Sequence, residues 1–273
     1  MKQALTIAGF DSNGSAGLAA DLHSFYAASI YGHGVLTGVV AENATTITAT
    51  TTTSPSFIKE EFNDLAEFHI TAAKTGMLAN SAIIKTVANC YSTAVFGPLV
   101  VDPVIITKRH NRLLSDDAFT DFRHELIPLA TVLTPNFTEA EELLDHDFTN
   151  QADIVEGAHQ LQAMGAQNVV IKGSHDQAQP LIHNYVLLAD GTDFWMNNRF
   201  VKTNKVNGAG DSFSAIITAE LAKGQPVVNA IKRANQFVDV AIHHPLAVGQ
   251  NFGPINHWAG EKAFTNDNDS IDG

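Results

Sequence analysis

The chain has 273 residues, of which 45% are hydrophobic and 16% are charged. These proportions are typical of a compact globular protein and exclude an intrinsically disordered chain or a coiled coil. Sixteen basic and twenty-nine acidic side chains leave a formal net charge of −13, which disfavours binding to a nucleic acid or an anionic membrane. The length suits one large α/β domain, which we expect over residues 1–260, followed by a polar, acidic tail over 261–273.

Cysteine content and the start of the chain indicate the compartment. The one cysteine, Cys90, cannot form an internal disulfide or a site with several thiolate ligands. Met1 is followed directly by a strand-like segment rather than by a signal peptide, and no apolar run reaches the length of a membrane span. We therefore expect a cytoplasmic protein with neither nucleic-acid nor membrane partners.

Short β-branched segments alternate with longer segments of helical periodicity along the first part of the chain. A buried strand is a short apolar run, whereas an amphipathic helix repeats its apolar residues three and four apart. Strands are predicted at residues 4–8, 35–40, 70–74, 99–104, 132–134 and 169–172, and the clearest helices at 15–28, 115–126 and 152–164. This alternation predicts a parallel sheet with helices on both faces.

The remainder of the chain has a different pattern. A β-hairpin at a sheet edge and two helices are predicted there, the hairpin over 181–188 and 193–203 and the helices over 212–223 and 227–243. The turn Asp190-Gly191 joins the hairpin strands, and Gly224 with Pro226 separates the helices. The Thr-rich segment 45–53, earlier in the chain, predicts an exposed strand or loop.

The strongest local signal is Asn207-Gly208-Ala209-Gly210-Asp211-Ser212, directly before an apolar helical pattern. Two glycines around a small residue allow a tight turn that points backbone N–H groups outward, and the positive end of a helix adds to their attraction for an anion. The Asp211 carboxylate would repel an anion, so it is either a helix cap or a base that meets a substrate hydroxyl. A capped helix after a glycine turn is the alternative that spacing alone leaves open.

A second glycine-rich loop, over residues 9–17, follows the first predicted strand. Loops at the carboxyl ends of strands line the ligand crevice of an open parallel sheet. Gly9, Gly14 and Gly17 do not have the dinucleotide spacing G-x-G-x-x-G, and the chain also lacks a Walker lysine motif and a G-x-S-x-G elbow. Asp21, in the following helix, is either a solvated residue or a part of this crevice.

Polar side chains recur at three further strand ends. Asp102 follows one predicted strand, Lys172 ends another, and between them Asn136 and Glu139 are three residues apart, as on one face of a helix. Oxygen ligands of this kind suit a hydrated Mg²⁺ ion. Each residue alone is more often a cap or a surface group, but together with the glycine turn they predict a site for a metal-bound phosphate. The twelve histidines show no zinc-ligand spacing.

Six ordered motifs resemble the ribokinase superfamily of ATP-dependent small-molecule kinases, and within it the branch of hydroxymethylpyrimidine kinases and related pyridoxal kinases. They are Ala8-Gly9-Phe10-Asp11 with Asp21, Lys74-Thr75-Gly76-Met77-Leu78, Val101-Asp102-Pro103-Val104, Thr134-Pro135-Asn136 with Glu139-Ala140, Ile171-Lys172-Gly173 and Gly208-Ala209-Gly210-Asp211. The resemblance extends from about Leu5 to His257. It implies a three-layer α/β/α ribokinase-like fold, with a mostly parallel central sheet and a small edge β-hairpin.

The resemblance also implies the roles of individual residues. Asp211 is the base that receives the proton of a substrate hydroxymethyl group, and the backbone N–H groups of Gly208, Ala209 and Gly210 form the anion hole for ATP. The implied substrate-ring residues are Gly9, Asp21, Glu42, Met77 and Val104; the implied ATP-binding residues are Asn136, Glu139, Lys172, Thr203, Val206, Gly208 and Gly210; Mg²⁺ is held by Asp102 and Glu139 through water. Members of this family are often dimers, so we expect a homodimer.

Departures from the family pattern bear on the substrate. Hydroxymethylpyrimidine kinases usually carry glutamine where Glu42 stands and commonly cysteine where Asp211 stands, and Arg109-His110 replace the Ser-Gly that tends to follow the lysine matching Lys108. A neutral amide both donates to and accepts from an aminopyrimidine, whereas an ionised Glu42 only accepts, which favours a ring with a protonated nitrogen or a hydroxyl. We therefore expect phosphorylation of pyridoxal, pyridoxine or pyridoxamine to the 5′-phosphate.

Three alternatives stand beside this expectation. The first is a hydroxymethylpyrimidine/phosphomethylpyrimidine kinase of thiamine biosynthesis. The second is a sugar kinase, although the chain shows no extra lid domain. The third is a non-catalytic pyridoxal- or nucleotide-binding protein of the same fold, against which the retention of Asp211 and both anion-hole glycines argues.

Overall fold

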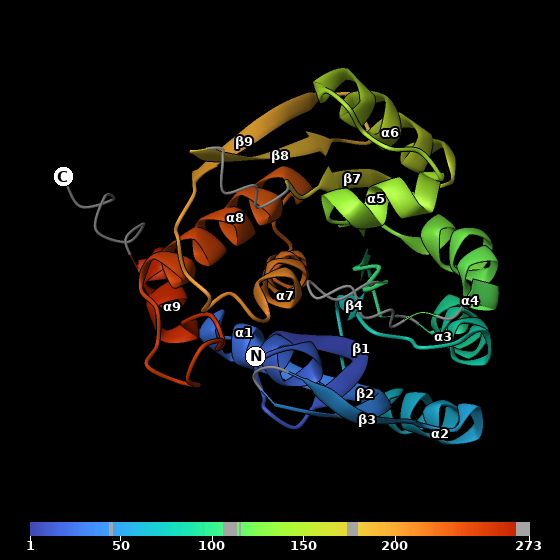
Figure 1. Cartoon of the computed structure of the whole chain (residues 1–273). Helices are drawn as coiled ribbons and strands as arrows, with labels where there is room; N and C mark the ends of the chain where they lie inside the picture. The colour runs from blue at the N-terminus through green and yellow to red at the C-terminus, as the bar shows by residue number, and fades with distance from the viewer. Residues whose placement is uncertain (44–45, 95, 106–113, 115, 174–179, 266–273) are drawn as a thin grey trace.

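The computed structural model describes residues 1–43, 46–94, 96–105, 114, 116–173 and 180–265. Within these ranges the chain forms one nine-stranded sheet in the order β3-β2-β1-β4-β5-β6-β7-β8-β9 (Figure 1). The strands are β1 (Gln3–Asp11), β2 (Tyr31–Glu42), β3 (Ile47–Thr52), β4 (Ala73–Thr75), β5 (Leu99–Val101), β6 (Val132–Leu133), β7 (Asn168–Ile171), β8 (Leu181–Leu187) and β9 (Asp193–Arg199).

The sheet is parallel in its centre and antiparallel at both edges. Strands β2, β1, β4, β5, β6 and β7 pair in parallel, whereas β3 is antiparallel to β2, and the β8–β9 hairpin is antiparallel to β7. The predicted mostly parallel sheet with an edge hairpin is therefore confirmed. Because parallel strands all point the same way, the residues that follow them collect at one edge of the sheet.

Helices cover both faces of the sheet (Figure 1). One face carries α1 (Gly17–Ala27), α7 (Ala209–Ala222), α8 (Val227–His243) and α9 (His257–Thr265); the other carries α2 (Pro55–Leu65), α3 (Ser81–Thr93), α4 (Asp116–Asp121), α5 (Phe137–Leu144) and α6 (Gln151–Ala163). Successive strand residues point to opposite faces, so Leu99 and Val101 lie in one apolar core and Val100 lies in the other. The predicted three-layer α/β/α fold is confirmed.

Several element boundaries differ from the sequence predictions. The helix predicted over 212–223 begins at Ala209, because Gly208 takes the cap position in the left-handed region with φ of 76°. The helix predicted over 115–126 is described as α4 and a π-helical turn over Phe122–Leu126. The strand predicted over 70–74 begins only at Ala73. The Thr-rich segment forms β3, which is largely exposed, as predicted.

Helices α2, α3 and α9 were not individually located from periodicity, whereas α5 begins beside Asn136, as the spacing of Asn136 and Glu139 predicts. Local caps explain two of them, since Ser54 accepts a hydrogen bond from the Phe57 N–H and Asn80 accepts one from the Ile83 N–H. Helix α9 extends into the predicted polar tail, of which residues 266–273 lie outside the described residues. No helix in the described ranges combines the length and the apolar character needed to cross a membrane.

A fully buried ion pair joins three elements of this fold. Lys74 on β4 places its Nζ 2.5 Å from Asp21 Oδ1 on α1 and 3.3 Å from the carbonyl oxygen of Asp211 on α7. Thr6 on β1 donates to the second carboxylate oxygen of Asp21 at 2.5 Å. Burial alone would lower the pKa of Lys74, but the surrounding carboxylates of Asp21, Asp211 and Asp102 raise it, so the ammonium stays charged.

Removal of the Lys74 charge should therefore destabilise the fold. Lys74→Met leaves a buried carboxylate without its partner, and we expect a loss of about 3–5 kcal/mol in the free energy of unfolding, measured by urea denaturation. The double variant Asp21→Asn/Lys74→Met removes both charges and should recover most of this loss. The matched control is Lys85→Met, which breaks a surface pair with Asp121 and should leave stability nearly unchanged. Equal stability of the Lys74 and Lys85 variants would contradict the expectation.

Candidate active site

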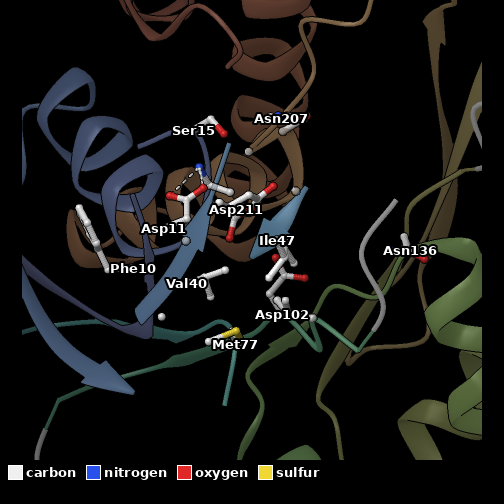
Figure 2. Close-up of a pocket in the computed structure, with 18 of the residues that line it drawn as sticks. Phe10, Asp11, Ser15, Val40, Ile47, Met77, Asp102, Asn136, Asn207 and Asp211 are labelled. Carbon is white, nitrogen blue, oxygen red and sulfur yellow. Dashed lines mark hydrogen bonds between the residues drawn. The ribbon is translucent and has the colours of Figure 1, made fainter. Parts of the chain in front are cut away.

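A cavity opens at the edge of the sheet where the parallel strands end, beside the first turn of α7 (Figure 2). In Figure 2 Asp11, Asp211 and Asp102 point into its centre, with Phe10 on one side of the view and Asn136 on the other. The residues that line it are Gly9, Phe10, Asp11, Ser15, Ala16, Gly17, Val40, Glu42, Ile47, Met77, Asp102, Val104, Asn136, Glu139, Lys172, Asn207, Gly208, Ala209, Gly210 and Asp211. The structure thus brings most of the predicted site residues together.

The glycine turn before α7 is built by close backbone packing. Gly208 has φ of 76°, and a Cβ at this residue would lie 2.1 Å from the Ser15 carbonyl oxygen, so a larger side chain does not fit. A Cβ on Gly210 would lie 3.3 Å from Lys172 Nζ, which places that ammonium beside the turn. The turn therefore combines free backbone approach, the positive end of α7 and a lysine, which are the requirements of an anion site.

Asp211 is the third residue of α7, and Gly208 holds the cap position. The helix-cap alternative for Asp211 is therefore wrong, and the side chain lines the cavity instead. Burial raises the pKa of Asp211 above its ordinary value and the Asp102 carboxylate raises it further, whereas Lys74 and Lys172 oppose the shift. A carboxylate in this setting is a stronger base than an exposed aspartate.

Asp102 and Lys172 meet across the ends of β5 and β7. Lys172 Nζ lies 3.2 Å from Asp102 Oδ1, and Ser214 on α7 donates to Asp102 Oδ2 at 3.0 Å. The same serine hydroxyl lies 3.0 Å from the Asp211 carbonyl oxygen. These contacts fix the Asp102 carboxylate against the first turns of α7 and hold the Lys172 ammonium near the glycine turn.

Glu139 has two structural partners at the start of α5. Its carboxylate accepts the Asn136 N–H at 2.9 Å and the Ile105 N–H at 3.2 Å, while the Asn136 side chain accepts the Glu139 N–H at 2.9 Å. Asn136 and Glu139 thus form a capping box, and their predicted place on one helix start is confirmed. Burial raises the pKa of Glu139 to about 7, against the opposing charge of Lys172.

The Asp102 and Glu139 carboxylates suit a magnesium ion only if water molecules bridge them to the metal. Both Asp102 oxygens and both Glu139 oxygens already accept hydrogen bonds, and in the described ranges no three His, Cys, Asp or Glu residues group as a direct metal cage. Mg²⁺ in phosphate sites commonly keeps several waters and uses few protein ligands. The Asp102 charge adds to the burial that raises the pKa values of Glu139 and Asp211, and a nearby cation would relieve this repulsion.

The opposite end of the cavity is apolar. Gly9 allows Met77 to approach, since a Cβ on Gly9 would lie 2.4 Å from Met77 Cε, and Thr37 fixes the Met77 carbonyl with a hydrogen bond of 2.5 Å. Val104 has φ of 43°, a left-handed conformation that costs energy for a β-branched residue and concentrates at functional sites. Glu42, the last residue of β2, also lines the cavity.

Asp11 is a cavity carboxylate to which sequence reasoning assigned no role. It ends β1 and accepts a hydrogen bond from the Ala16 N–H at 3.2 Å. Burial raises the pKa of Asp11 to about 6, and the charges of Asp211 and Glu42 add to the shift. Asp11 follows the strand predicted over residues 4–8 and lies in the glycine-rich loop, and this position is the sequence feature that could have pointed to a cavity role. Phe10, Val40 and Ile47 were also missed as lining residues, because the way β3 folds beside β2 is not visible in the sequence.

Three predicted site residues lie outside this cavity. Asp21 is neither solvated nor in the crevice, since its carboxylate is buried against Lys74. Thr203 accepts a hydrogen bond from the Lys205 N–H at 3.1 Å, and Val206 lines a smaller cavity between the β8–β9 hairpin and α8. The predicted departure at Lys108 to His110 falls outside the described residues.

Comparisons with known proteins agree with this geometry. The model of the phosphomethylpyrimidine kinase family matches residues 11–256. The hydroxymethylpyrimidine/phosphomethylpyrimidine kinase of Haemophilus influenzae is 41% identical over 262 residues, which cover 95% of this chain and 97% of that protein. The Bacillus subtilis protein of the same name is 36% identical over 259 residues, covering 94% of this chain and 95% of that protein.

Solved structures of pyridoxal kinases have the same fold. The ADP complex of the Bacillus subtilis pyridoxal kinase is 35% identical with a TM-score of 0.85, covering 95% of this chain and 98% of that one. The Staphylococcus aureus pyridoxal kinase with AMP-PCP and pyridoxal is 30% identical with a TM-score of 0.86, covering 95% and 94%. The chain therefore belongs to the phosphomethylpyrimidine kinase family of ribokinase-like, ATP-using kinases, which transfer a phosphoryl group to a hydroxyl group.

Proposed function

We propose that this chain phosphorylates the hydroxymethyl group of pyridoxal, pyridoxine or pyridoxamine, with ATP as the donor and Mg²⁺ as the metal. The observation that carries the proposal is the position of Asp211, between an apolar cavity end that suits a flat ring and a glycine turn that suits a phosphate. A ring bound in the apolar end would place its hydroxymethyl group next to the Asp211 carboxylate, with the glycine turn beyond it. This is the order that phosphoryl transfer to a ring alcohol requires.

The reaction follows from these positions. The substrate oxygen forms a bond to the γ-phosphorus of ATP, the bond between that phosphorus and the ADP oxygen breaks, and Asp211 receives the hydroxyl proton. The N–H groups of Gly208 and Gly210 at the start of α7, together with Lys172, stabilise the negative charge on the transferring phosphoryl group. The predicted part of Ala209 is not supported, because its N–H donates to the Val206 carbonyl oxygen at 3.3 Å. Asp102 and Glu139 would hold Mg²⁺ through water, and the ion would neutralise charge on the nucleotide phosphates.

The choice of ring depends on the acidic groups that line the cavity, among them Glu42 and Asp11. The Glu42 charge adds to the burial that raises the pKa of Asp11. Ionised carboxylates accept hydrogen bonds, which favours the phenol and protonated nitrogen of a pyridoxal-type ring. The pyridoxal bound by the Staphylococcus aureus relative supports this preference.

Hydroxymethylpyrimidine is the second candidate substrate. The specific observation in its favour is the name of the relatives that match nearly the whole chain, since those from Haemophilus influenzae and Bacillus subtilis are both called hydroxymethylpyrimidine/phosphomethylpyrimidine kinases. A protonated Glu42 would donate as well as accept, and would then suit an aminopyrimidine edge.

The homodimer and the single kinase domain over residues 1–260 stay predictions.

Replacement of Asp211 should abolish most of the turnover. Asp211→Asn keeps the shape of the side chain but cannot accept the proton, so we expect kcat to fall by about 10²- to 10⁴-fold with the KM for ATP little changed. A coupled assay for ADP measures both. Asp64→Asn, on the exposed side of α2, is the matched control and should behave like the wild type. Full activity of Asp211→Asn would remove Asp211 from its proposed role.

The pH dependence of kcat should report the buried Asp211. The base works only when deprotonated, and its pKa is raised, so kcat should fall on acidification with a midpoint above the ordinary aspartate value of 3.8. Asp11→Asn removes a neighbouring negative charge and should move this midpoint to lower pH. The measurement is kcat against pH at saturating substrates for both proteins. An unchanged or higher midpoint in the variant would contradict the proposed coupling.

Substrate preference is measured by offering pyridoxal and 4-amino-5-hydroxymethyl-2-methylpyrimidine side by side with ATP. We expect a higher kcat/KM for pyridoxal because Glu42 only accepts hydrogen bonds when ionised. Glu42→Gln should shift the ratio toward the pyrimidine, since the amide both donates and accepts. A higher kcat/KM of the wild type for the pyrimidine overturns the preference, and binding of either ring without ATP turnover would indicate a non-catalytic protein. Ribose and fructose phosphates should not react.

A further inference from the structure

A β-bulge lies in the sheet next to the apolar end of the cavity. Strands β1 and β2 pair one to one up to Ala8 and Leu36. The next pair is Gly9 with Gly38, so Thr37 is an extra residue in β2. Bulges redirect the side chains around them and are frequent beside active sites. The place of this bulge, one residue before the cavity residue Gly9, therefore suggests a role in shaping the cavity.

The bulge places two glycines against Met77. A Cβ on Gly9 would lie 2.4 Å from Met77 Cε, and a Cβ on Gly38 would lie 3.6 Å from the same atom. The hydroxyl of Thr37, the extra residue, donates to the Met77 carbonyl oxygen at 2.5 Å. Because Gly9 and Met77 both line the cavity, the geometry of the bulge determines where the Met77 side chain lies in the apolar end.

Glu61 holds the bulge from outside the cavity. It lies on α2, which packs beside β2 (Figure 1), and its Oε1 accepts the Leu36 N–H at 3.1 Å. Strand β3 pairs with β2 only over residues 38–42, so no β3 residue pairs with Leu36 and the carboxylate supplies the acceptor. Glu61 Oε2 is buried without a hydrogen-bond partner among the described residues. A buried oxygen without a partner costs free energy, so the contact with Leu36 is kept against a penalty.

We propose that Glu61 is a positioning residue for the substrate ring: its carboxylate holds the β2 bulge, and the bulge sets Gly9 and Met77 against the ring. The inference rests on the proposed function, because that function places a ring in the apolar end. Glu61 itself does not line the cavity. The proposed phosphate end is formed by other elements, the start of α7, the start of α5 and Lys172 after β7. A change at Glu61 should therefore alter the binding of the ring and leave the binding of the nucleotide unchanged.

The test compares Glu61→Leu with Glu61→Gln by isothermal titration calorimetry. The ring probes are pyridoxine, which has no aldehyde to react with lysines, and 4-amino-5-hydroxymethyl-2-methylpyrimidine; the nucleotide probe is AMP-PCP with Mg²⁺. Leucine removes the acceptor of the Leu36 N–H, so the Kd of each ring that the wild type binds should rise at least about tenfold, with the Kd of AMP-PCP within about twofold. Glutamine keeps an oxygen acceptor and should bind both probes nearly as the wild type does. The matched control is Glu60→Leu, at the exposed neighbour on α2, which should leave both Kd values unchanged.

A second variant covers the case in which Glu61→Leu does not fold, as judged by circular dichroism. Thr37→Val removes the hydrogen bond to the Met77 carbonyl and nearly keeps the side-chain shape, so it should weaken ring binding and spare AMP-PCP in the same way. An unchanged ring Kd in a folded variant, or a rise in the Kd of AMP-PCP as large as that of the ring, overturns the proposal. Loss of the fold in both variants would assign Glu61 and Thr37 to stability alone and overturns it as well.

The positioning role and the proposed function can fail separately. If the wild type binds a ring without ATP turnover and Glu61→Leu weakens that binding, the proposed function fails and the positioning role of Glu61 stands. If the wild type phosphorylates a ring and Glu61→Leu has the same KM for it, the positioning role fails and the proposed function stands. A wild type that binds neither ring overturns both.

Discussion

The burial of one ammonium group, Lys74, is the constraint on which the rest of the active edge depends. Its contacts with the Asp21 carboxylate and the Asp211 carbonyl tie a central strand to two helices that lie on the same face of the sheet. Desolvation of a lysine is costly, and it is offset here by the carboxylates of Asp21 on α1, Asp211 on α7 and Asp102 after β5. The Lys74 ammonium therefore holds the first turn of α7 through the Asp211 carbonyl oxygen, and the Asp211 side chain faces the cavity.

The chain carries a net charge of −13, yet the anion site that we propose needs no excess of basic residues. In that proposal the backbone at the positive end of α7 and Lys172 attract the anion, while Asp11, Asp102, Glu139 and Asp211 also line the cavity. Such a cluster of carboxylates repels a bare phosphate but accommodates one that arrives with a divalent cation. Overall acidity excludes extended polyanions and leaves room for a metal-bound nucleotide.

Residues whose role follows from a local pattern could be predicted from the sequence. Two glycines before an apolar helix predicted the glycine turn at the start of α7, and the parallel order of the strands placed Asp102, Asn136 and Lys172 at one edge. Asp21 was misplaced, because its partner is 53 residues away and nothing local announces the pairing. The lining role of Ile47 was invisible for the same reason, since it depends on how β3 pairs with β2.

The two roles of Glu139 constrain how this edge of the protein can evolve. Its carboxylate closes the capping box of α5 and accepts the Ile105 N–H, and the residue also lines the cavity. Selection for a stable helix start and selection for charge in the cavity therefore act on the same side chain. A lineage that relaxes one demand still keeps the residue for the other, so its retention in a relative is no sign by itself that catalysis persists there.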